Sequence, residues 1–534
     1  MKIKKVWAAF LTASLFTSLA AGCGNSSEPE SLDTAGKSSE TAVGSSGDSG
    51  DSTQGYDEDI AEIEVMFWTM NTIPRDVQMV EDAINEITEE KINTQVHLNI
   101  LEMGNYAQQL NLILSSNEKM DLMVTLPGES AHFNSMSSQN QLTDLTELLP
   151  EYAPELLETV PESWLKGTMV DGKILSVTSY GDKATPLGFV CRTDILEQTG
   201  IDPETLKTAD DFEALFEKVK AVDPDITPLA VGNKKILTTP YLIDSEGNFV
   251  KYDSLGDSDN ALIGIMEGDE TTIQNNYLRP EFVETAKCFT SWYEKGYVYK
   301  DGANFDEAAE TLISANTAFG YFSTVPVGSE ASKSAVCGHD MTIIYLDNEP
   351  LISTELIRKF TWAVPTTATE PEAAVKFMNL LFTDSEVLNL LTWGIEGVHY
   401  QTLEDGTIDF MDGEDANSCG YYIGDETAIL GSGFLAKVRT GSEPDLRAES
   451  ETMNLNATVS DFLGFSFDSE GFENQIAGIT NAIAECRPSL ASGLYTENYY
   501  NDFIQKLNDS GAQEYIANIQ QQLDAWLSEN RSGE

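Results

Sequence analysis

Hydrophobic residues in the first part of the folded chain follow strand and helix periods in turn. Short apolar or alternating runs predict strands at 63–68, 95–100 and 121–126. Apolar residues spaced three or four apart predict helices between these strands, at 75–91 and 106–116. Strands that alternate with helices are typical of βαβ units. The sequence therefore predicts an α/β fold built on mostly parallel sheets flanked by helices.

The pattern becomes more mixed after residue 180. An apolar run at 189–191 predicts a strand, and turn-forming residues within 243–249 and 403–408 predict two hairpins. Amphipathic spacing predicts further helices at 192–196, 210–220, 371–382 and 498–528. The chain after residue 60 is too long for a single hydrophobic core, so we expect at least two lobes.

Residues 1–22 have the features of a lipoprotein signal peptide. Three lysines precede an apolar run from Val6 to Leu19, which is shorter than the ~20 residues that a membrane-spanning helix needs. The run leads into Ala20-Ala21-Gly22-Cys23, which is similar to a bacterial lipobox, although Ala20 stands where the motif has leucine. We expect Cys23 to carry a lipid anchor. An ordinary signal peptide with an unrelated cysteine is the alternative.

Residues 23–59 are mostly Ser, Gly, Asp, Glu and Thr, with almost nothing large and apolar. Such a segment cannot bury enough apolar surface to offset the entropy that ordering would cost. We therefore expect a disordered, flexible tether between the lipid and the folded body.

The chain is strongly acidic, with 88 Asp and Glu residues against 31 Lys and Arg residues and a formal net charge of −57. No basic stripe that could bind phosphates stands out, so we expect no nucleic-acid partner. The same charge disfavours contact with anionic lipid head groups. The N-terminal lipid is therefore the expected membrane attachment.

The sequence gives few signs of covalent or metal chemistry. GxSxG, HExxH and GxxxxGK[ST] motifs are absent, and the four histidines show no metal-ligand spacing. The acidic run from Asp257 to Asn260 lacks the glycine of an EF-hand loop. Five cysteines besides Cys23 cannot all pair within one chain, and both free thiols and a single disulfide remain open. We expect no enzyme activity, no cofactor and no metal site.

Four groups of residues resemble a known family in their order along the chain. The first is a strand that ends at Trp68, and the second runs from Tyr106 to an aspartate-led strand at Asp121. The third spans 142–196, and the fourth spans 364–400 and ends in Gly-Ile-Glu-Gly-Val-His-Tyr. This arrangement resembles the family 1 extracellular solute-binding proteins, the maltose-binding-like receptors of ABC importers. The fourth group, together with a later Gly-Phe-Ser-Phe-Asp run, resembles the LipO-type lipoproteins of Gram-positive bacteria.

The resemblance implies a type II periplasmic-binding-protein-like fold. In this fold two α/β lobes, joined by crossing segments that act as a hinge, form a clamp that closes on a solute. The expected first lobe comprises 60–178 and 338–400, and the expected second lobe comprises 179–337 and 401–534. The resemblance also implies a lipid-anchored monomer on the extracellular face of the cell membrane. Its expected partners are a sugar or oligosaccharide and the permease subunits of an ABC importer.

Candidate solute-binding residues of the first lobe lie where predicted strands end, because ligands of open α/β sheets bind outside the carboxyl ends of the strands. Trp68, Thr69 and Asn71 follow the first strand, and Gly128 and Glu129 follow the third. An aromatic face can cover the C–H patches of a sugar, and amides and carboxylates can bond its hydroxyls. The alternatives to solute binding are that Trp68 packs in the core and that the residues after the third strand form an ordinary loop.

Further candidates come from the second lobe and the crossing segments. The resemblance places an aromatic platform at Tyr321 and Phe322. Tyr180 lies near the expected first crossing, and Arg192 has the forked guanidinium that binds pairs of oxygens. The remaining candidates are Trp362, Trp393 and Glu396. Each of these residues has an alternative role that does not involve a solute. The tryptophans could pack in the core, Arg192 could form an ordinary salt bridge, and Glu396 could form a contact between the lobes.

The sequence thus predicts a receptor that binds a sugar by lobe closure and passes it to an importer. One alternative is a surface-anchored carbohydrate hydrolase, which would need two carboxylates fixed across a groove. Another is a sensory receptor that binds the same solute and reports it to a membrane kinase. The solute could also be something other than a sugar, because the fold determines the two-lobed architecture but not which side chains line the binding site.

Overall fold

The computed structural model describes residues 60–127, 130–233, 241–424 and 429–530. The predicted signal peptide, the lipid-anchor residue Cys23 and the predicted tether lie outside the described residues. Gly128 and Glu129 also lie outside them. The roles predicted for these residues therefore stay predictions.

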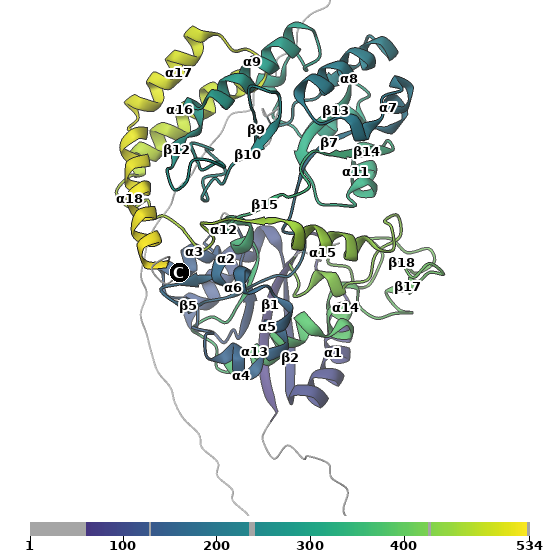
Figure 1. Cartoon of the computed structure of the whole chain (residues 1–534). Coiled ribbons are helices and arrows are strands. Elements are labelled where there is room, and N and C mark those ends of the chain that lie inside the picture. The colour runs from purple at the N-terminus through teal and green to yellow at the C-terminus, as the bar shows by residue number, and fades with distance from the viewer. Residues whose placement is uncertain (1–59, 128–129, 234–240, 425–428, 531–534) are drawn as a thin grey trace, which may run out of the picture. The chain divides into compact units, whose positions relative to one another are not determined.

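The first sheet has five strands in the order β2-β1-β3-β16-β6 (Figure 1). They are β1 (Ala61–Thr69), β2 (Thr94–Glu102), β3 (Leu122–Val124), β16 (Thr361–Ala363) and β6 (Val177–Thr178). β1 runs parallel to both β2 and β3, which confirms the βαβ pattern predicted for the start of the folded chain. β16 runs antiparallel to both of its neighbours, β3 and β6.

The helices of the first sheet begin and end where the sequence supplies capping residues. α1 (Val77–Ile92) and α2 (Met103–Ser116) link the first three strands and end at Asn93 and Asn117, which take the left-handed conformation that asparagine tolerates. α13 (Pro371–Thr383) begins with a proline, whose missing N–H costs nothing in a first turn. α14 (Ser385–Trp393) begins at Asp384, whose carboxylate accepts two backbone N–H groups. These helices share one core with the sheet.

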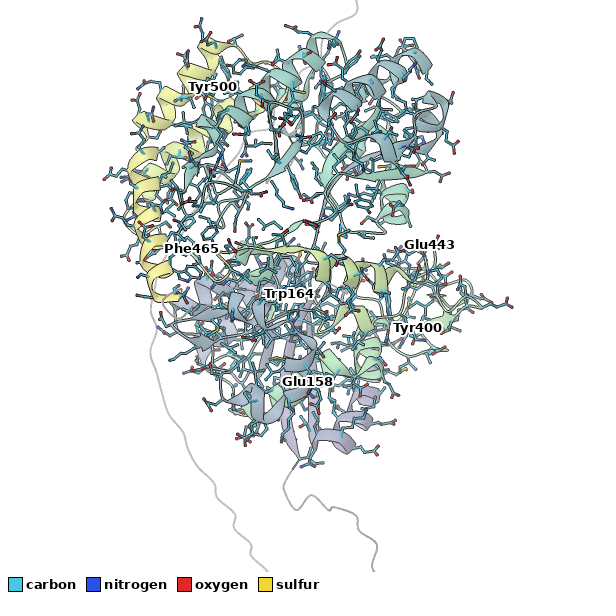
Figure 2. All side chains as sticks on the ribbon, in the orientation of Figure 1. Glu158, Trp164, Tyr400, Glu443, Phe465 and Tyr500 are labelled. Atoms are coloured by element: carbon cyan, nitrogen blue, oxygen red, sulfur yellow. The ribbon has the colours of Figure 1, made fainter. Side chains whose placement is uncertain are left out.

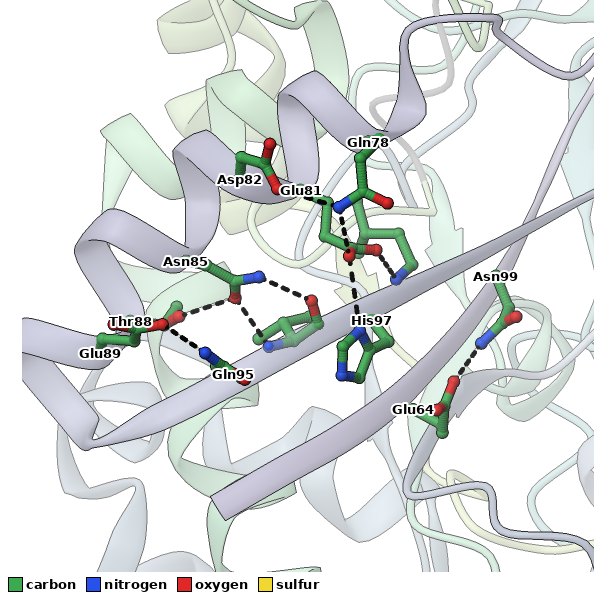
Figure 3. Close-up of polar contacts among 12 residues, drawn as sticks. Glu64, Gln78, Glu81, Asp82, Asn85, Thr88, Glu89, Gln95, His97 and Asn99 are labelled. Atoms are coloured by element: carbon green, nitrogen blue, oxygen red, sulfur yellow. Dashed lines mark hydrogen bonds and ion pairs between the residues drawn. The ribbon is translucent and has the colours of Figure 1, made fainter. Parts of the chain in front are cut away.

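The outer edge of β2 is occupied by side chains of α1 (Figure 3). The Asn85 side chain accepts a hydrogen bond from Val96 N at 2.7 Å and donates one to Val96 O at 3.1 Å. The Glu81 carboxylate accepts from Leu98 N at 2.8 Å and from Gln78 Nε2 at 3.0 Å. An edge strand with free N–H and C=O groups invites pairing with another chain. Here α1 side chains bond the N–H and C=O groups of Val96 and the N–H group of Leu98, which covers the middle of this edge.

The second sheet has four strands in the order β14-β7-β13-β8. They are β14 (Met341–Tyr345), β7 (Leu187–Arg192), β13 (Ala318–Thr324) and β8 (Thr227–Leu229). α7 (Thr193–Thr199) and α8 (Ala209–Val222) follow β7, and the Thr208 and Asp211 side chains form a capping box at the start of α8. Phe189 lies among Phe212, Phe216 and Phe322 at the centre of this second core.

The expectation of mostly parallel sheets holds for the first three strands of the chain but not for the second sheet. In the second sheet β7 is antiparallel to both β13 and β14, and only β13 and β8 run parallel. The reason is the path of the chain. β7 leads away from the segment that follows the first sheet, and β14 leads back toward the first sheet, so the two neighbours must run in opposite directions. β6 and β16 are antiparallel for the same reason.

A third core is built from the C-terminal helices α16 (Glu473–Ala491), α17 (Glu497–Asp509) and α18 (Ala512–Asn530). The single helical stretch predicted at 498–528 is two helices, because Gly511 has a φ of +84° and ends the helical path between α17 and α18. Phe465, labelled in Figure 2, packs edge-on against Trp526 with ring centroids 5.9 Å apart. This contact ties α18 to the loop that precedes α16.

Three segments connect the cores, and we name them crossing segments. Residues 179–186 lead from β6 to β7, residues 346–360 lead from β14 to β16, and residues 437–461 lead from the first core to the third. The second and third crossing segments are joined by the parallel pair β15 (Leu351–Ile352) and β19 (Thr458–Val459). α12 (Thr354–Arg358) and α15 (Leu446–Asn456) lie within these two segments.

The cores do not follow the expected lobe boundaries at two places. β14 was expected in the first lobe with 338–400, but it pairs with β7 in the second sheet. Residues from Tyr421 to Ala436 were expected in the second lobe, but those that are described and buried pack in the first core. We therefore propose a first lobe of about 60–178 and 361–436, with the second sheet spanning 187–345.

The remaining elements agree with the sequence pattern where it made a prediction. Hairpins form at β9 (Tyr241–Ile243) with β10 (Phe249–Lys251), and at β17 (Tyr400–Thr402) with β18 (Ile408–Phe410), as predicted. The described helices of eight residues or more without a prediction are α9 (Pro280–Glu294), α11 (Glu330–Cys337), α14, α15 and α16. None of the described helices is long and apolar enough to cross a membrane.

Candidate functional site

A groove lies at the carboxyl ends of β1 and β2, where the sequence analysis expected part of the site. We name it the β1–β2 groove. It has a volume of about 490 Å³ and is lined by Thr69, Met70, Asn71, Thr72, Glu102, Met103, Gly104, Ala416 and Asn417. Met70 is 59% exposed, so the groove offers an accessible apolar side chain beside amide, hydroxyl and carboxylate groups. The structure thus brings together two of the predicted residues, Thr69 and Asn71.

Thr69 and Asn71 have different places in this groove. The Thr69 side chain is buried, and its hydroxyl donates to Ile423 O at 2.9 Å and accepts from Asn71 N at 3.0 Å. Thr69 therefore fixes the turn after β1. Asn71 is half-exposed, and no described residue bonds its side-chain amide. Asn71 is thus the predicted residue that is best placed to contact a solute here.

Trp68 and Trp362 lie inside the first core. The Trp68 side chain is 2% exposed and packs against Phe360 with ring centroids 5.7 Å apart. Trp362 has no exposed surface, and its indole N–H donates to Ile429 O at 2.9 Å. For both residues the structure favours the core alternative, because neither ring has a face left for a sugar.

The aromatic platform expected in the second lobe is also buried. Tyr321 is 4% exposed and its hydroxyl donates to Glu310 at 2.8 Å, while Phe322 is 3% exposed and packs among the phenylalanines of the second core. The Arg192 guanidinium donates two hydrogen bonds to Asp194 and one to Asn316. These contacts favour the salt-bridge alternative for Arg192 and a packing role for the two aromatic residues.

Tyr180, Trp393 and Glu396 occupy three different environments. Tyr180 lies near the start of the first crossing segment. It packs against Trp164 (Figure 2) with ring centroids 5.5 Å apart, and its hydroxyl donates to Glu451 at 3.1 Å. Trp393 is buried in a small separate cluster. Glu396 is exposed and accepts a hydrogen bond from the Thr402 hydroxyl at 2.6 Å. The structure does not bring these three residues together.

His399, in the motif that ends at Tyr400, is held in its neutral form. It is 2% exposed, and its Nδ1 accepts from Ile395 N at 2.9 Å. Burial lowers the pKa of His399, although Asp76 at 3.7 Å opposes this. The folded protein therefore resists protonation at a pH where the unfolded chain accepts a proton.

This difference predicts a pH-dependent stability. The contribution of His399 is fully present above its unfolded pKa of ~6.5, and it is lost as the pH falls below that value. We expect His399→Asn to flatten the fall in free energy of unfolding between pH 7 and pH 5, measured by urea denaturation at several pH values. The lowered pKa of His132 remains in both proteins and cancels in the comparison. If the free energy of unfolding falls as steeply with pH in the variant as in the natural protein, the lowered pKa of His399 is contradicted.

A second pocket was not expected from the sequence, and we name it the hydroxyl-lined pocket. It is a cavity of about 160 Å³ lined by Thr185, Tyr241, Tyr252, Ser254, Ser258, Thr324, Leu351, Ser353, Glu355 and Leu356. Thr324 ends β13, so this wall lies at the carboxyl end of a strand, where ligands of α/β sheets bind. Thr185 lies on the first crossing segment, and Ser353 and Glu355 lie on the second.

Some polar groups of this pocket are held by protein partners. The Tyr241 hydroxyl donates to Asp347 at 2.7 Å, and Lys251 lies 3.2 Å from the same carboxylate. Ser258 donates to Glu355 at 2.7 Å. Burial raises the pKa of Glu355, and the bond from Ser258 opposes this rise. These pairs fix the shape of the pocket and hold the Glu355 carboxylate in place.

Other polar groups of the pocket have no partner within the described chain. The hydroxyls of Thr185, Ser254, Thr324 and Tyr252 make no hydrogen bond to a described residue. Each can donate one hydrogen bond and accept others. Tyr252 and Tyr241 also line a smaller, mostly apolar cavity of about 70 Å³. The pocket therefore combines fixed aromatic rings with hydroxyls that are available to a polar solute.

Sequence reasoning missed this pocket because its lining comes from separate stretches of chain. No local motif joins Thr185, the hairpin at β9 and β10, the end of β13 and the start of α12. The available signals were indirect. Thr324 comes two residues after the aromatic pair expected at Tyr321 and Phe322, and Thr185 comes shortly after Tyr180, near the expected first crossing.

The described cysteines are free thiols, so the open question of a disulfide is settled for them. Cys191, Cys337 and Cys486 are buried, and Cys288 and Cys419 are half-buried. Burial raises the pKa of each thiol, which disfavours the reactive thiolate. Within the described ranges, no group of three His, Cys, Asp or Glu side chains is arranged to hold a metal ion.

Comparisons with known proteins agree with this architecture. A family model described as bacterial extracellular solute-binding protein matches residues 76–387, which is more than half of the chain. A second model, described as a domain of unknown function (DUF3502), matches residues 461–528 and so covers most of the C-terminal helices. A carbohydrate ABC transporter substrate-binding protein of Streptococcus pneumoniae is 24% identical over 463 residues, which cover 84% of this chain and 87% of that protein.

Solved structures confirm the predicted type II fold. The N-glycan transport solute binding protein NgtS of Streptococcus pneumoniae superposes with a TM-score of 0.74 at 22% identity, over 88% of this chain and all of that chain. The same protein in complex with Man5GlcNAc gives a TM-score of 0.59. An HMO-binding solute binding protein of Bifidobacterium longum infantis gives 0.57 at 15% identity, over 88% of this chain and 99% of that chain. By its sequence match and its fold, this chain belongs to the bacterial extracellular solute-binding protein family.

Proposed function

We propose that this protein captures an oligosaccharide outside the cell and delivers it to the permease subunits of an ABC importer. The observation that carries the proposal is the hydroxyl-lined pocket, in a chain whose family binds solutes. Relatives named for carbohydrate, N-glycan and HMO binding support a sugar as the solute. The pocket and the β1–β2 groove are the two contact regions that we propose for it.

The chemistry of the pocket suits a sugar. Sugars present many hydroxyls in fixed directions, and a site that leaves such groups unbonded loses affinity. Unpartnered hydroxyls of Thr185, Thr324 and Tyr252 can exchange hydrogen bonds with them, while the tyrosine rings cover C–H surface. Binding between crossing segments would couple the solute to movement of the lobes.

Binding without catalysis is the second part of the proposal. A glycosidase needs two carboxyl groups that flank the bond to be cleaved. Among the described residues that line the hydroxyl-lined pocket, Glu355 is the only carboxylate, and Ser258 is bonded to it. The relatives are binding proteins of transporters. We therefore infer a receptor, held at the extracellular face of the membrane of a Gram-positive cell by a lipid on Cys23.

A binding measurement with matched variants tests the proposal. We expect a rise of several degrees in the unfolding temperature of residues 60–534 with one class of oligosaccharide, because a ligand of the folded state stabilises it. The double variant Thr185→Val, Thr324→Val removes two unpartnered hydroxyls without changing side-chain shape. We expect it to bind at least ~10-fold more weakly, since each lost hydrogen bond contributes ~1 kcal/mol.

Thr311→Val is the matched control, because Thr311 is exposed on α10 (Ala309–Ser314) and does not line the pocket. Equal affinity of the double variant and this control would reject the pocket as the site. Release of reducing sugar during the assay would instead favour a hydrolase. No response to any oligosaccharide would reject a sugar as the solute.

A further inference from the structure

The apolar cavity beside the hydroxyl-lined pocket is built from three parts of the chain. Its volume is about 70 Å³. The apolar part of its wall includes Leu242 of β9, Phe282, Ala286 and Phe289 of α9, and Leu490 and Ala491 of α16. Phe289 belongs to the second core and Leu490 to the third, so the cavity lies where these two cores meet.

Two tyrosines, Tyr241 and Tyr252, line both the apolar cavity and the hydroxyl-lined pocket. Both side chains are buried, and they follow each other closely on the β9–β10 hairpin and just after it. The two spaces therefore adjoin at this pair of aromatic rings. A solute that occupies the hydroxyl-lined pocket thus has the apolar cavity within reach of a short substituent.

Most polar side chains in the wall of the apolar cavity are bonded to the protein. The Asn276 side chain donates to two backbone carbonyls and accepts from a guanidinium. The Thr285 hydroxyl donates to one backbone carbonyl and accepts from one backbone N–H. Arg487 donates to two backbone carbonyls, and the Tyr277 hydroxyl donates to one of them. A buried water needs two to four polar partners, so this cavity suits an apolar group better than water.

Tyr252 is the shared tyrosine whose hydroxyl has no partner within the described chain. The Tyr241 hydroxyl, in contrast, donates to Asp347 at 2.7 Å. The Tyr252 hydroxyl can therefore donate to a carbonyl oxygen of a solute. An acyl group combines such a carbonyl with an apolar chain. An ester fits this site better than an amide, because an amide adds an N–H donor for which the bonded groups of the cavity wall leave no acceptor.

The volume of the apolar cavity limits the length of the chain. A cavity of ~150 Å³ lined by apolar side chains binds benzene. A cavity of about 70 Å³ is half as large, so it suits a chain of roughly two or three carbon atoms but not a benzene ring.

We propose that the solute is an oligosaccharide with a short ester-linked acyl group, whose sugar lies in the hydroxyl-lined pocket and whose acyl chain fills the apolar cavity. This inference rests on the proposed function and narrows its substrate class. Leu490 and Ala491 belong to residues 461–528, which match the domain of unknown function. The C-terminal helices would thereby supply part of the solute site.

Native mass spectrometry of residues 60–534 with acylated sugars tests the proposal, because the mass identifies each species that binds. The probes are mannotetraose, xylotetraose and maltotetraose, each bare or with a single acetyl, propionyl or benzoyl ester. Each buried CH₂-sized group strengthens binding about 4-fold, which is ~0.8 kcal/mol. We therefore expect a gain over the bare sugar of about 4-fold for the acetyl ester and about 15-fold for the propionyl ester. The benzoyl ester should show no gain, because its ring exceeds the cavity.

Two variants fill the cavity from opposite sources of its wall. Ala491→Val acts from α16 and Ala286→Val acts from α9. We expect each variant to bind the propionyl ester no more tightly than the bare sugar. Ala484→Val is the matched control, because Ala484 is exposed on α16 and does not line the cavity, so this variant should keep the preference. Thermal unfolding shows which variants fold, and either of the two cavity-filling variants is sufficient for the test.

The outcomes separate this inference from the proposed function. Equal affinity for bare and acylated sugars, or a preference that the cavity-filling variants retain, would overturn the acyl-group inference alone. A gain that continues to the benzoyl ester would also overturn it, because the apolar group would then bind elsewhere. Tighter binding of chitotetraose, in which the acetyl groups are amides, than of every ester would overturn the ester linkage. Failure of all sugars to bind, bare or acylated, would reject the proposed function as well.

Discussion

Replacement of Arg358 by methionine is expected to lower the free energy of unfolding by about 3–5 kcal/mol, because several buried hydrogen bonds from a charged donor are lost together. Arg358 is 3% exposed at the end of α12, and burial lowers its pKa to about 10. Its guanidinium donates to Gly167 O at 2.8 Å, Met169 O at 3.3 Å and Gly464 O at 3.1 Å. It also donates to the Asn134 side chain at 2.9 Å.

The large effect follows from what the variant leaves behind. Methionine fills much of the space but bonds none of these oxygens, so buried acceptors lose their partners. The cation–π contact of Arg358 with Phe133, at 4.8 Å, is lost as well. Because Gly464 belongs to the C-terminal region, we expect that region to loosen from the first core.

Urea denaturation of the variant measures the loss. Arg75→Met is the matched control, since the Arg75 side chain is 66% exposed and its ion pair with Asp76 is 3.7 Å long, so its cost should stay below ~1 kcal/mol. If Arg358→Met lowers the free energy of unfolding no more than the control does, solvent replaces the lost hydrogen bonds.

Gly431→Ala is expected to destabilise the protein by about 3 kcal/mol, because collision and backbone strain act together. Gly431 has a φ of +39°, where an L-residue is strained. An added Cβ would overlap the Leu381 carbonyl oxygen, which accepts a hydrogen bond from Ser432 N at 3.0 Å. The Gly431 carbonyl in turn accepts from Tyr180 N at 2.8 Å, so any shift moves the start of the first crossing segment.

Gly172→Ala separates the two causes. Gly172 has a φ of +76° and no atom within 4 Å of an added Cβ, so it reports the backbone strain alone, ~1 kcal/mol. Thermal and urea denaturation of both variants gives the difference that collision contributes. Equal losses would show that the loop around Gly431 shifts without cost.

Local patterns in the sequence predicted most of the elements. The strand from Ala61 to Thr69 and the helix from Val77 to Ile92 lie close to the predicted positions, because hydrophobic period and asparagine caps are local properties. Strand direction in the second sheet was not predictable in this way. It depends on where β14 returns to the first sheet, which is a property of the chain path.

The candidate site was predicted less well than the fold. A tryptophan at a strand end satisfies the pattern of a sugar platform and equally that of a core residue, and Trp68 took the core position because Phe360 covers it. Thr185 and Thr324 carry no local signal, since a hydroxyl becomes a site residue only through neighbours that come from distant segments. Asn71 lines the β1–β2 groove, where strand-end topology alone puts it, and its contact with a solute stays a prediction.

Along the chain, the second sheet lies between the first three strands of the first sheet and its strand β16. This arrangement determines the order in which the two sheets can be completed during synthesis. All strands of the second sheet lie between Leu187 and Tyr345, so they can pair as soon as this stretch has emerged. The first sheet must wait for β16, and its core must wait for residues up to Ala436. Contacts between distant residues form slowly, because a long loop must close before they are made. The first sheet, whose first three strands are made earliest, is therefore completed last.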